Sequence, residues 1–230
     1  MTERTIVVIG AGAAGLMAAG FAAARGHKVI VLEKGRRPGQ KLLITGKGRC
    51  NVTNQCDTDT FMANVPGNGR FLYSAYSKFS AEDIMAFFES NGVPLKVERG
   101  NRVFPVSDRA SDIVQALVHH AEEAGAEIRC HQVVQGLQVQ DGAIAGVRLV
   151  NDRILTCDAV IVATGGISYP VTGSTGDGYR LAEASGHRVV PPKPSLVPLE
   201  TEEDWVAEAS GLTLKNISIR VENAKGKMVY

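Results

Sequence analysis

The sequence predicts an α/β fold in which a parallel sheet is combined with an antiparallel meander. Three observations carry this prediction. A strand, a helix and a second strand follow one another within residues 4–34, three short alternating strands occupy 133–157, and a further apolar run, 158–166, ends in two glycines. Strands joined through helices favour parallel pairing, whereas strands joined by two-residue turns favour antiparallel pairing.

Composition and charge bound the class of protein. The chain has 230 residues, of which 44% are hydrophobic and 21% are charged, as is typical of a soluble globular protein with a sizeable core. A net charge of +1 provides no general attraction to nucleic acid or to an acidic membrane. We therefore expect neither a nucleic-acid partner nor a membrane partner, and the composition leaves the oligomeric state open.

The first thirty residues do not have the pattern of a targeting segment. Glycines interrupt their apolar positions, and the basic start and cleavage site of a signal peptide are missing. No run approaches the ~20 apolar residues of a membrane span. These features predict a cytoplasmic protein whose four cysteines stay reduced.

The first strand, helix and second strand form a βαβ unit. Residues 4–10, RTIVVIG, are a β-branched run ending in glycine, as expected of a buried parallel strand. The alanine-rich residues 13–26 predict a helix that ends at Gly26, and residues 28–34, KVIVLEK, predict the second strand. The crossover between these strands should be right-handed.

Capping residues mark two helices farther along the chain. Ser80, with Asp83 three residues later, predicts a helix that continues through Asn91. A second helix over 110–124 stops at a glycine, and the residues that follow it, 126–131, predict a third strand of the parallel sheet.

Turn residues mark the meander and the end of the larger domain. Asp141-Gly142 and Asn151-Asp152 separate the three alternating strands. A helix from Asp177 to Ser185 closes the region. Four prolines in 191–200 predict the crossing to a second domain, which gives domains of 1–190 and 191–230.

The start of the second domain alternates between apolar and polar residues. Residues 211–230 have the pattern of a β-hairpin whose turn lies near Asn223 to Gly226. The second strand of that hairpin has scarcely begun at Tyr230. We therefore expect 191–230 to be the beginning of a β-rich domain.

Gly10, Gly12 and Gly15 have the G-x-G-x-x-G spacing of a dinucleotide-binding turn. The spacing alone is a weak signal, but here it follows a strand and opens a helix, and Glu33 ends the next strand. Gly10 permits the tight turn, Gly12 lets backbone amides approach a pyrophosphate, and Gly15 allows close packing of the helix. The carboxylate of Glu33 can accept hydrogen bonds from ribose hydroxyls and disfavours a 2′-phosphate. The sequence thus predicts a Rossmann-like dinucleotide site.

The segment after the βαβ unit is rich in glycine and cations. Residues 34–56 hold six lysines and arginines and no carboxylate, and they include the string GQKLLITGKGRCNVTN, 39–54. A P-loop ending at Gly46-Lys47 would need a glycine at position 41 and a hydroxyl at position 48, where the chain has Lys41 and Gly48. We interpret the segment as a cover over the dinucleotide instead.

The order of the later elements favours FAD over NAD. A basic loop, a long excursion, a third strand, a meander and the run VIVATGG together resemble the FAD domain of glutathione-reductase-like flavoproteins. Four strings are also similar to the BaiN/YhiN-like family of bacterial NAD(P)/FAD-dependent oxidoreductases: GQKLLITGKGRCNVTN, NRVFPVSDRASDIVQAL (101–117), GGISYPVTGSTGDGYRLAEASGH (165–187) and PSLVPLE (194–200). The resemblance covers essentially the whole chain.

This resemblance implies a function and a longer protein. It implies hydride transfer through FAD to or from an unidentified small organic substrate, with NAD(P)H as electron donor. It also implies a β-rich insert domain and a final FAD-binding segment beyond residue 230. Two alternatives stay open. One is a non-catalytic or regulatory FAD- or NAD-binding protein, and the other is a fumarate-reductase-like flavoenzyme, because STGDGYRLAEASGH is similar to that class.

The resemblance and the motifs together predict the site residues. The catalytic residues stay unassigned, with Arg49, Cys50 and Tyr169 as candidates. The predicted cofactor-binding residues are Gly10, Gly12, Ala13, Ala14, Gly15, Glu33, Lys34, Lys41, Thr45, Gly46, Gly48, Arg49, Cys50, Asn51, Val134, Ala163, Thr164, Gly165, Gly166 and Asp177.

A redox-active cysteine site and a metal site are two further possibilities. Cys50 and Cys56 are spaced C-x5-C, whereas flavoprotein disulfide reductases use C-x4-C, so ordinary buried thiols are the expectation. The adjacent Arg49 nevertheless favours a lowered pKa at Cys50, which keeps a reactive thiol open. His119 and His120 fall on the 110–124 helix without a third ligand, so we expect a solvated helix face and no metal site.

Overall fold

The computed structural model describes residues 2–194, 200–214 and 216–228. The chain divides into two compact units, Met1–Val189 and Val190–Tyr230. The first unit holds the sheets, the large helices and the cavity described below. Each unit is described by itself.

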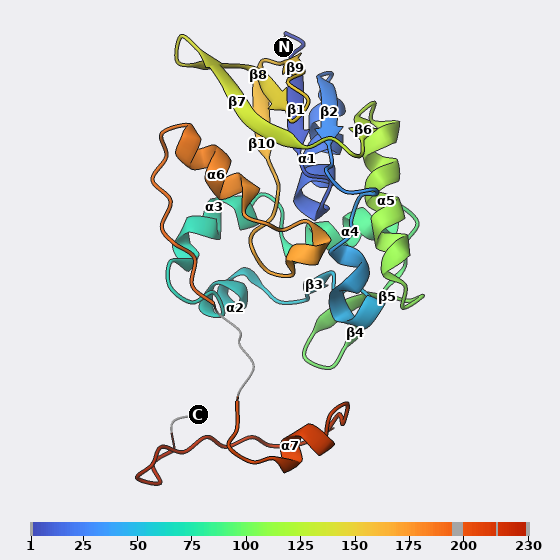
Figure 1. Cartoon of the computed structure of the whole chain (residues 1–230). Coiled ribbons are helices and arrows are strands. Elements are labelled where there is room, and N and C mark those ends of the chain that lie inside the picture. The colour runs from blue at the N-terminus through green and yellow to red at the C-terminus, as the bar shows by residue number, and fades with distance from the viewer. Residues whose placement is uncertain (1, 195–199, 215, 229–230) are drawn as a thin grey trace. The chain divides into compact units, whose positions relative to one another are not determined.

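A four-stranded parallel sheet forms the centre of the first unit (Figure 1). Its strands occur in the order β10-β1-β2-β6, so the two strands of the predicted βαβ unit lie in the middle. The third parallel strand predicted from the sequence is confirmed as the edge strand β6. The bounds are β1 (Thr5–Ile9), β2 (Lys28–Leu32), β6 (Glu127–Arg129) and β10 (Ala159–Val162).

Both faces of this sheet are covered, which explains why its central strands are apolar throughout. Helices α1 (Ala13–Ala23) and α5 (Ala110–Glu123) pack over one face, where Ile6 and Val8 point. The meander of β7 (Val134–Gln140), β8 (Ala143–Leu149) and β9 (Ile154–Thr156) covers the other face, where Val7 and Ile9 point. Because strand side chains alternate between faces, each run contributes to two cores. The predicted α/β class with a parallel sheet and a meander is confirmed.

A long excursion between β2 and α5 carries a second, antiparallel sheet of order β3-β5-β4. The predicted capping box is confirmed at its longest helix, α4: Ser80 accepts from the Asp83 amide while the Asp83 carboxylate accepts from the Ser80 amide. The sequence did not predict the small sheet. The elements are η1 (Leu42–Gly48), β3 (Thr53–Asn54), α2 (Thr58–Ala63), η2 (Gly69–Leu72), α3 (Tyr73–Tyr76), α4 (Ala81–Ser90), β4 (Leu95–Glu98) and β5 (Arg102–Pro105).

The chain returns from β10 to the sheet edge through a short turn η3 (Pro170–Thr172) and helix α6 (Asp177–Ala184). This helix matches the predicted one to within a residue. Its buried Leu181 packs with Val134 and Val147 of the meander and with strand residues of the central sheet. The return therefore brings the residues before α6 back to the carboxyl ends of the parallel strands.

The second unit corrects one prediction. The expected turn is present, because the Gly226 amide donates to the Asn223 carbonyl, and Glu222 and Met228 form an isolated β-bridge. The expected hairpin strands are not formed over the described part of 211–228; the helix here is the short α7 (Trp205–Glu208). Alternating apolar residues such as Leu212 and Ile219 stay exposed, and a two-stranded hairpin without a partner for its apolar face is marginal. Residues 195–199, 215, 229 and 230 of the predicted crossing and hairpin lie outside the described residues.

Among residues 2–194, 200–214 and 216–228, no helix combines the length and apolar character needed to cross a bilayer.

Candidate functional site

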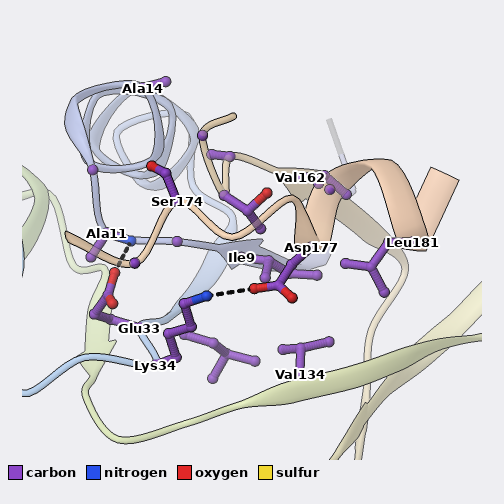
Figure 2. A pocket seen from close by; sticks show the side chains of 18 of the residues that line it. Ile9, Ala11, Ala14, Glu33, Lys34, Val134, Val162, Ser174, Asp177 and Leu181 are labelled. Atoms are coloured by element: carbon purple, nitrogen blue, oxygen red, sulfur yellow. Dashed lines mark hydrogen bonds and ion pairs between the residues drawn. The ribbon is translucent and has the colours of Figure 1, made fainter. Parts of the chain in front are cut away.

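A cavity of about 1130 Å³ lies at the carboxyl ends of the parallel strands (Figure 2). Ile9, Leu32 and Val162, the last residues of β1, β2 and β10, all line it. In open α/β sheets, ligands bind outside the carboxyl ends of the strands, between the connections that leave in different directions. Its walls come from residues 9–14, 32–34, 39–42, 45, 132–134, 137, 139, 142–144, 160, 162–166, 172–174, 177–179, 181, 182, 185 and 187.

The three motif glycines meet three different steric demands. Gly10 has φ +103°, and a Cβ there would lie 2.5 Å from the Ala163 carbonyl oxygen. A Cβ at Gly15 would overlap the Gly10 carbonyl oxygen, so this glycine lets α1 pack onto the turn. Around Gly12, which lines the cavity, a Cβ would meet nothing within 4 Å. The open space therefore lies in front of Gly12, where close approach to a ligand was predicted.

The N-terminus of α1 faces this space without a side-chain cap. Gly12 is the N-cap residue, and the first turn contains no acidic side chain. Ala13 and Ala14 line the cavity. The first amides of a helix have no partner within the helix and carry partial positive charge, so they form a site for an anion.

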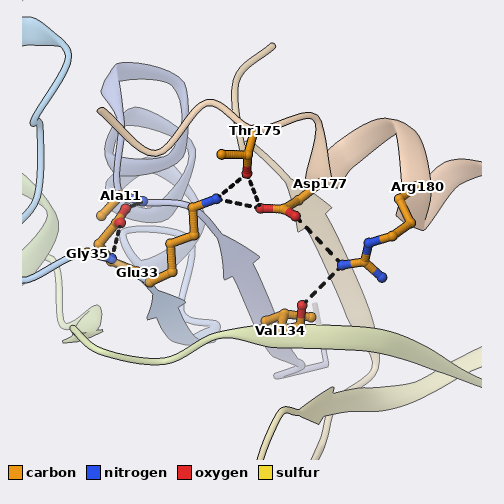
Figure 3. Close-up of polar contacts among 8 residues, drawn as sticks. Ala11, Glu33, Gly35, Val134, Thr175, Asp177 and Arg180 are labelled. Carbon is orange, nitrogen blue, oxygen red and sulfur yellow. Dashed lines mark hydrogen bonds and ion pairs between the residues drawn. The ribbon is translucent and has the colours of Figure 1, made fainter. Parts of the chain in front are cut away.

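Glu33 lies at the edge of the cavity and is held by two backbone amides (Figure 3). Its Oε2 accepts from the Ala11 amide at 2.9 Å, and its Oε1 accepts from the Gly35 amide at 2.7 Å. The carboxylate therefore fixes the glycine turn. An ionised carboxylate has about four acceptor positions, so two remain for ribose hydroxyls.

Lys34 and Asp177 both line the cavity and form an ion pair across it (Figure 2). Lys34 Nζ lies 2.6 Å from Asp177 Oδ2 and donates to Thr175 Oγ1 at 2.5 Å. Burial opposes ionisation of Asp177, but the hydrogen bond and charge of Lys34 outweigh it and lower the pKa of the carboxyl. Arg180 continues the network with a 2.6 Å hydrogen bond to the Gln135 carbonyl. The network thus joins the end of β2, the start of α6 and the meander.

The basic segment divides into residues that line the cavity and residues that do not. Lys41 and Thr45 line it, and Lys41 Nζ donates to the Ser168 carbonyl at 2.6 Å. The other predicted contacts in the segment lie outside the cavity wall, and their cofactor contacts stay predictions. These residues are Gly46, Gly48, Arg49, Cys50 and Asn51.

The Arg49 side chain makes its contacts with the small antiparallel sheet and with the residues just after it. Its guanidinium forms ion pairs with Glu98 and with Asp108, the latter at 2.7 Å, and lies 4.1 Å from the ring centroid of Phe104. Lys96 also pairs with Asp108, at 2.6 Å. The charge of Arg49 is therefore compensated by carboxylates that lie 49 and 59 residues farther along the sequence.

The two other catalytic candidates do not lie in the cavity wall. Cys50 is 1% exposed, and burial raises the pKa of its thiol, while a weaker hydrogen bond with Thr45 opposes this shift. The expectation of a lowered pKa from Arg49 is therefore wrong, because Arg49 is paired elsewhere and the thiol is desolvated. Tyr169 is 68% exposed. The four cysteines are free thiols.

The described residues contain no group of three His, Cys, Asp or Glu side chains arranged to hold a metal ion. His119 is exposed, as expected of a solvated helix face. His120 is not: its ring extends from α5 against α1 and α4, with centroids 5.5 Å from Phe21 of α1 and 4.9 Å from Phe87 of α4. The expectation that both histidines face solvent is therefore wrong for His120.

The remaining predicted residues line the cavity, and several residues that were not predicted join them. Val134, Ala163, Thr164, Gly165 and Gly166 are all part of the wall. The sequence reasoning missed an apolar wall from the meander and the polar residues before α6. The alternation of the meander strands indicated one apolar face but not what it faced. The missed residues include Leu137, Val139, Ile144, Ser174, Tyr179 and Leu181.

Comparison with known proteins relates the chain to a described family. A family model described as "HI0933-like protein Rossmann domain" matches residues 4–228. The chain is 34% identical over 212 residues to a "Ribosomal RNA dihydrouridine synthase" of Haemophilus influenzae, covering 90% of this chain and 52% of that protein. It is 33% identical over 211 residues to a "3-dehydro-bile acid delta(4,6)-reductase" of Clostridium scindens, covering 90% and 50%. The chain thus spans about half the length of these curated relatives.

A solved structure shares the fold. Sdh1 of Mycobacterium smegmatis, in complex with UQ1, superimposes with a TM-score of 0.60 at 22% identity, covering 80% of this chain and 38% of that chain. At this identity the similarity concerns the fold alone.

Proposed function

Because this chain belongs to the HI0933-like Rossmann-domain family, we propose that it acts as part of an FAD-dependent oxidoreductase. One observation carries the proposal: the uncapped N-terminus of α1 opens at Gly12 into a cavity of about 1130 Å³ that has Glu33 at its edge. Ligand pockets commonly measure about 300–1,000 Å³, so this cavity has room for a cofactor as large as a dinucleotide.

The residues of the cavity fit the parts of FAD. The amides of Gly12, Ala13 and Ala14 would bind the pyrophosphate, and the free acceptor positions of Glu33 would bind the adenosine ribose. The apolar Val134 would lie beside the adenine, and the backbone of residues 163–166 would pass close to the cofactor. FAD, when bound, supplies hydride chemistry that no amino-acid side chain provides, while the protein supplies binding, orientation and exclusion of water.

The reaction class is inferred from the two relatives together. The name of one describes the formation of dihydrouridine, and the name of the other describes the reduction of delta(4,6) bonds in a 3-dehydro compound. Both names denote reduction of a carbon–carbon double bond conjugated to a carbonyl group. We propose that this protein reduces such a bond in a small organic substrate, with NAD(P)H as the electron donor. The sequence contains no second nucleotide fingerprint, so the donor rests on the family resemblance alone.

An RNA base is a second candidate substrate, contrary to the expectation from net charge. The name of the H. influenzae relative is one reason. The other is local: Arg36, Arg37 and Lys47 are exposed and form no ion pair with the described residues. Local cations of this kind can bind a phosphate backbone even where the net charge is small.

An anaerobic absorbance titration tests the central proposal. The purified protein, supplied with FAD, should show a flavin spectrum that bleaches when NADPH or NADH is added, and the colour should return with a conjugated enone or with uridine-containing RNA. A protein that binds no FAD would contradict the proposal. Bound FAD that neither nicotinamide reduces would favour a regulatory binding protein, and reoxidation by fumarate alone would favour the fumarate-reductase-like alternative.

The cellular setting and the domain division are proposed on the same basis. We propose that the protein works in the cytoplasm, where its four free cysteines stay reduced. We also propose that residues 191–230 are the beginning of a β-rich insert or substrate domain. Fractionation of cells expressing the whole protein tests the first point.

A further inference from the structure

Ser174 lies in the wall of the cavity, in the loop that leads into α6. Its side chain is 5% exposed, and it is the one polar residue among the buried residues that the structure describes. The hydroxyl forms no hydrogen bond with any residue of the described ranges. Its oxygen is not among the fully buried unpartnered atoms of the described residues, so it keeps access to the open space of the cavity. Ser174 therefore presents an unused hydrogen-bond donor to the cavity, and a ligand that accepts a hydrogen bond can take the place of water there.

The location of Ser174 indicates where that ligand would lie. The residue belongs to the loop between η3 and α6, and its Oγ lies 2.8 Å from the point where Gly165 would carry a Cβ. Gly165 has φ +75° and lines the same cavity. Figure 2 shows the Ser174 side chain beside the start of α1, with its hydroxyl pointing towards the turn that carries Ala14. The hydroxyl and the first turn of α1 thus face one part of the cavity.

The chemistry of this part of the cavity favours an anionic oxygen. Helix α1 is 11 residues long, and its N-cap Gly12 offers no side chain to its own amides. The nearby cations are already engaged, Lys34 by Asp177 and Thr175 and Lys41 by a backbone carbonyl. The groups left to bind an anion are therefore neutral donors, and a serine hydroxyl is one of them.

We infer that Ser174 donates a hydrogen bond to a phosphate oxygen of the dinucleotide and completes the donor set at the N-terminus of α1. This inference rests on the proposed function, which supplies the dinucleotide. It assigns Ser174 to the phosphates rather than to the nucleoside, and this distinction makes the assignment testable without measuring turnover.

The test compares Ser174→Ala with the unchanged protein in its affinity for FAD, ADP and adenosine, measured by calorimetry. The loss of a hydrogen bond to a charged oxygen should weaken the binding of FAD and of ADP about tenfold. The affinity for adenosine should stay unchanged. Because the hydroxyl has no partner among the described residues, the variant without ligand should unfold at a temperature no lower than the unchanged protein. Ser90→Ala on α4 is the matched control, because the Ser90 hydroxyl already donates to the Phe87 carbonyl and lies outside the cavity.

Each outcome separates the inference from the proposed function. If the unchanged protein binds neither FAD nor ADP, both the proposed function and the inference about Ser174 are contradicted. If it binds them and Ser174→Ala binds them equally well, only the role of Ser174 is overturned. An equal loss for adenosine, or a lower unfolding temperature without ligand, would make Ser174 a structural residue and would also overturn its role.

Discussion

At the scale of single residues, Glu33 combines two tasks in one carboxylate. It accepts hydrogen bonds from the Ala11 and Gly35 amides, and it lies where ribose hydroxyls are expected. Glu33→Ala should therefore lower the free energy of unfolding by about 1–3 kcal/mol, the usual range for a lost hydrogen bond to a charged group. It should also weaken the binding of adenosine as strongly as the binding of FAD. Ser174→Ala, in contrast, should weaken the binding of FAD and leave that of adenosine unchanged. Urea unfolding and calorimetric titration measure the two effects, and an unchanged affinity for adenosine would contradict the ribose assignment.

Cys50 shows how burial decides the chemistry of a thiol. Because burial raises its pKa and only 1% of the residue is exposed, Cys50 should hold little thiolate at neutral pH. Iodoacetamide at pH 7.5 should therefore modify Cys50 at least about tenfold more slowly than the half-buried Cys56, because the raised pKa of Cys50 and its restricted access both slow the reaction. Peptide mass spectrometry over time measures both rates within one sample. Faster modification of Cys50 would restore the reactive-cysteine interpretation.

At the scale of elements, the turn between β1 and α1 contains a matched pair of glycines. Gly10→Ala would place a Cβ 2.5 Å from the Ala163 carbonyl at a φ of +103°, so it should cost several kcal/mol of stability or prevent folding. Gly12→Ala meets open space at an ordinary φ of −81°, so the protein without ligand should lose only about 1 kcal/mol. The added methyl group would nevertheless occupy the approach to the α1 amides, and FAD binding should fall sharply.

Thermal unfolding without ligand and FAD titration separate the two glycine variants. Gly12→Ala should be folded but deficient in binding, whereas Gly10→Ala should be deficient in folding. If Gly12→Ala bound FAD normally, the phosphate would not approach this turn.

The packing of α1 against α5 predicts a pH dependence. The Nε2 atom of His120 is buried without a hydrogen-bond partner, and burial lowers the pKa of the ring, with Glu123 opposing the shift. The unfolded chain therefore binds a proton more readily near pH 6.5 than the folded chain does. The contribution of neutral His120 to the free energy of unfolding is complete above pH 6.5. It should decrease as the pH falls from there towards the lowered pKa of the folded protein.

His120→Leu should remove this decline. Urea unfolding at pH 8 and at pH 5.5 would show a smaller difference in unfolding free energy for the variant than for the unchanged protein. The comparison within each protein cancels the change in packing that the substitution itself causes. An equal pH dependence in both proteins would contradict the role assigned to His120.

At the scale of the whole molecule, the sequence predicted what local patterns determine. The βαβ unit, the glycine turn, the capping box and the meander follow from the spacing of apolar, capping and turn residues, and they are confirmed. What depends on distant contacts was not predictable. Lys34 meets Asp177 across 143 positions, and Arg49 pairs with Glu98 and Asp108 rather than acting on Cys50. The hairpin expected in 211–230 failed for a related reason, since its alternation indicates an apolar face but no surface to receive it.

The cavity draws its walls from segments throughout the first unit, so cofactor binding should stabilise these segments together. At a free FAD concentration of 100 times its Kd, the free energy of unfolding should rise by about 2.7 kcal/mol. Hydrogen exchange should slow in 10–14, 33–45, 132–144 and 163–182, because each of these ranges contributes cavity residues. The amides of α4, which contributes none, serve as the internal reference. Protection confined to 10–14 would indicate a ligand no larger than a phosphate, whereas protection of all four ranges requires a ligand that extends along the whole cavity, as FAD does.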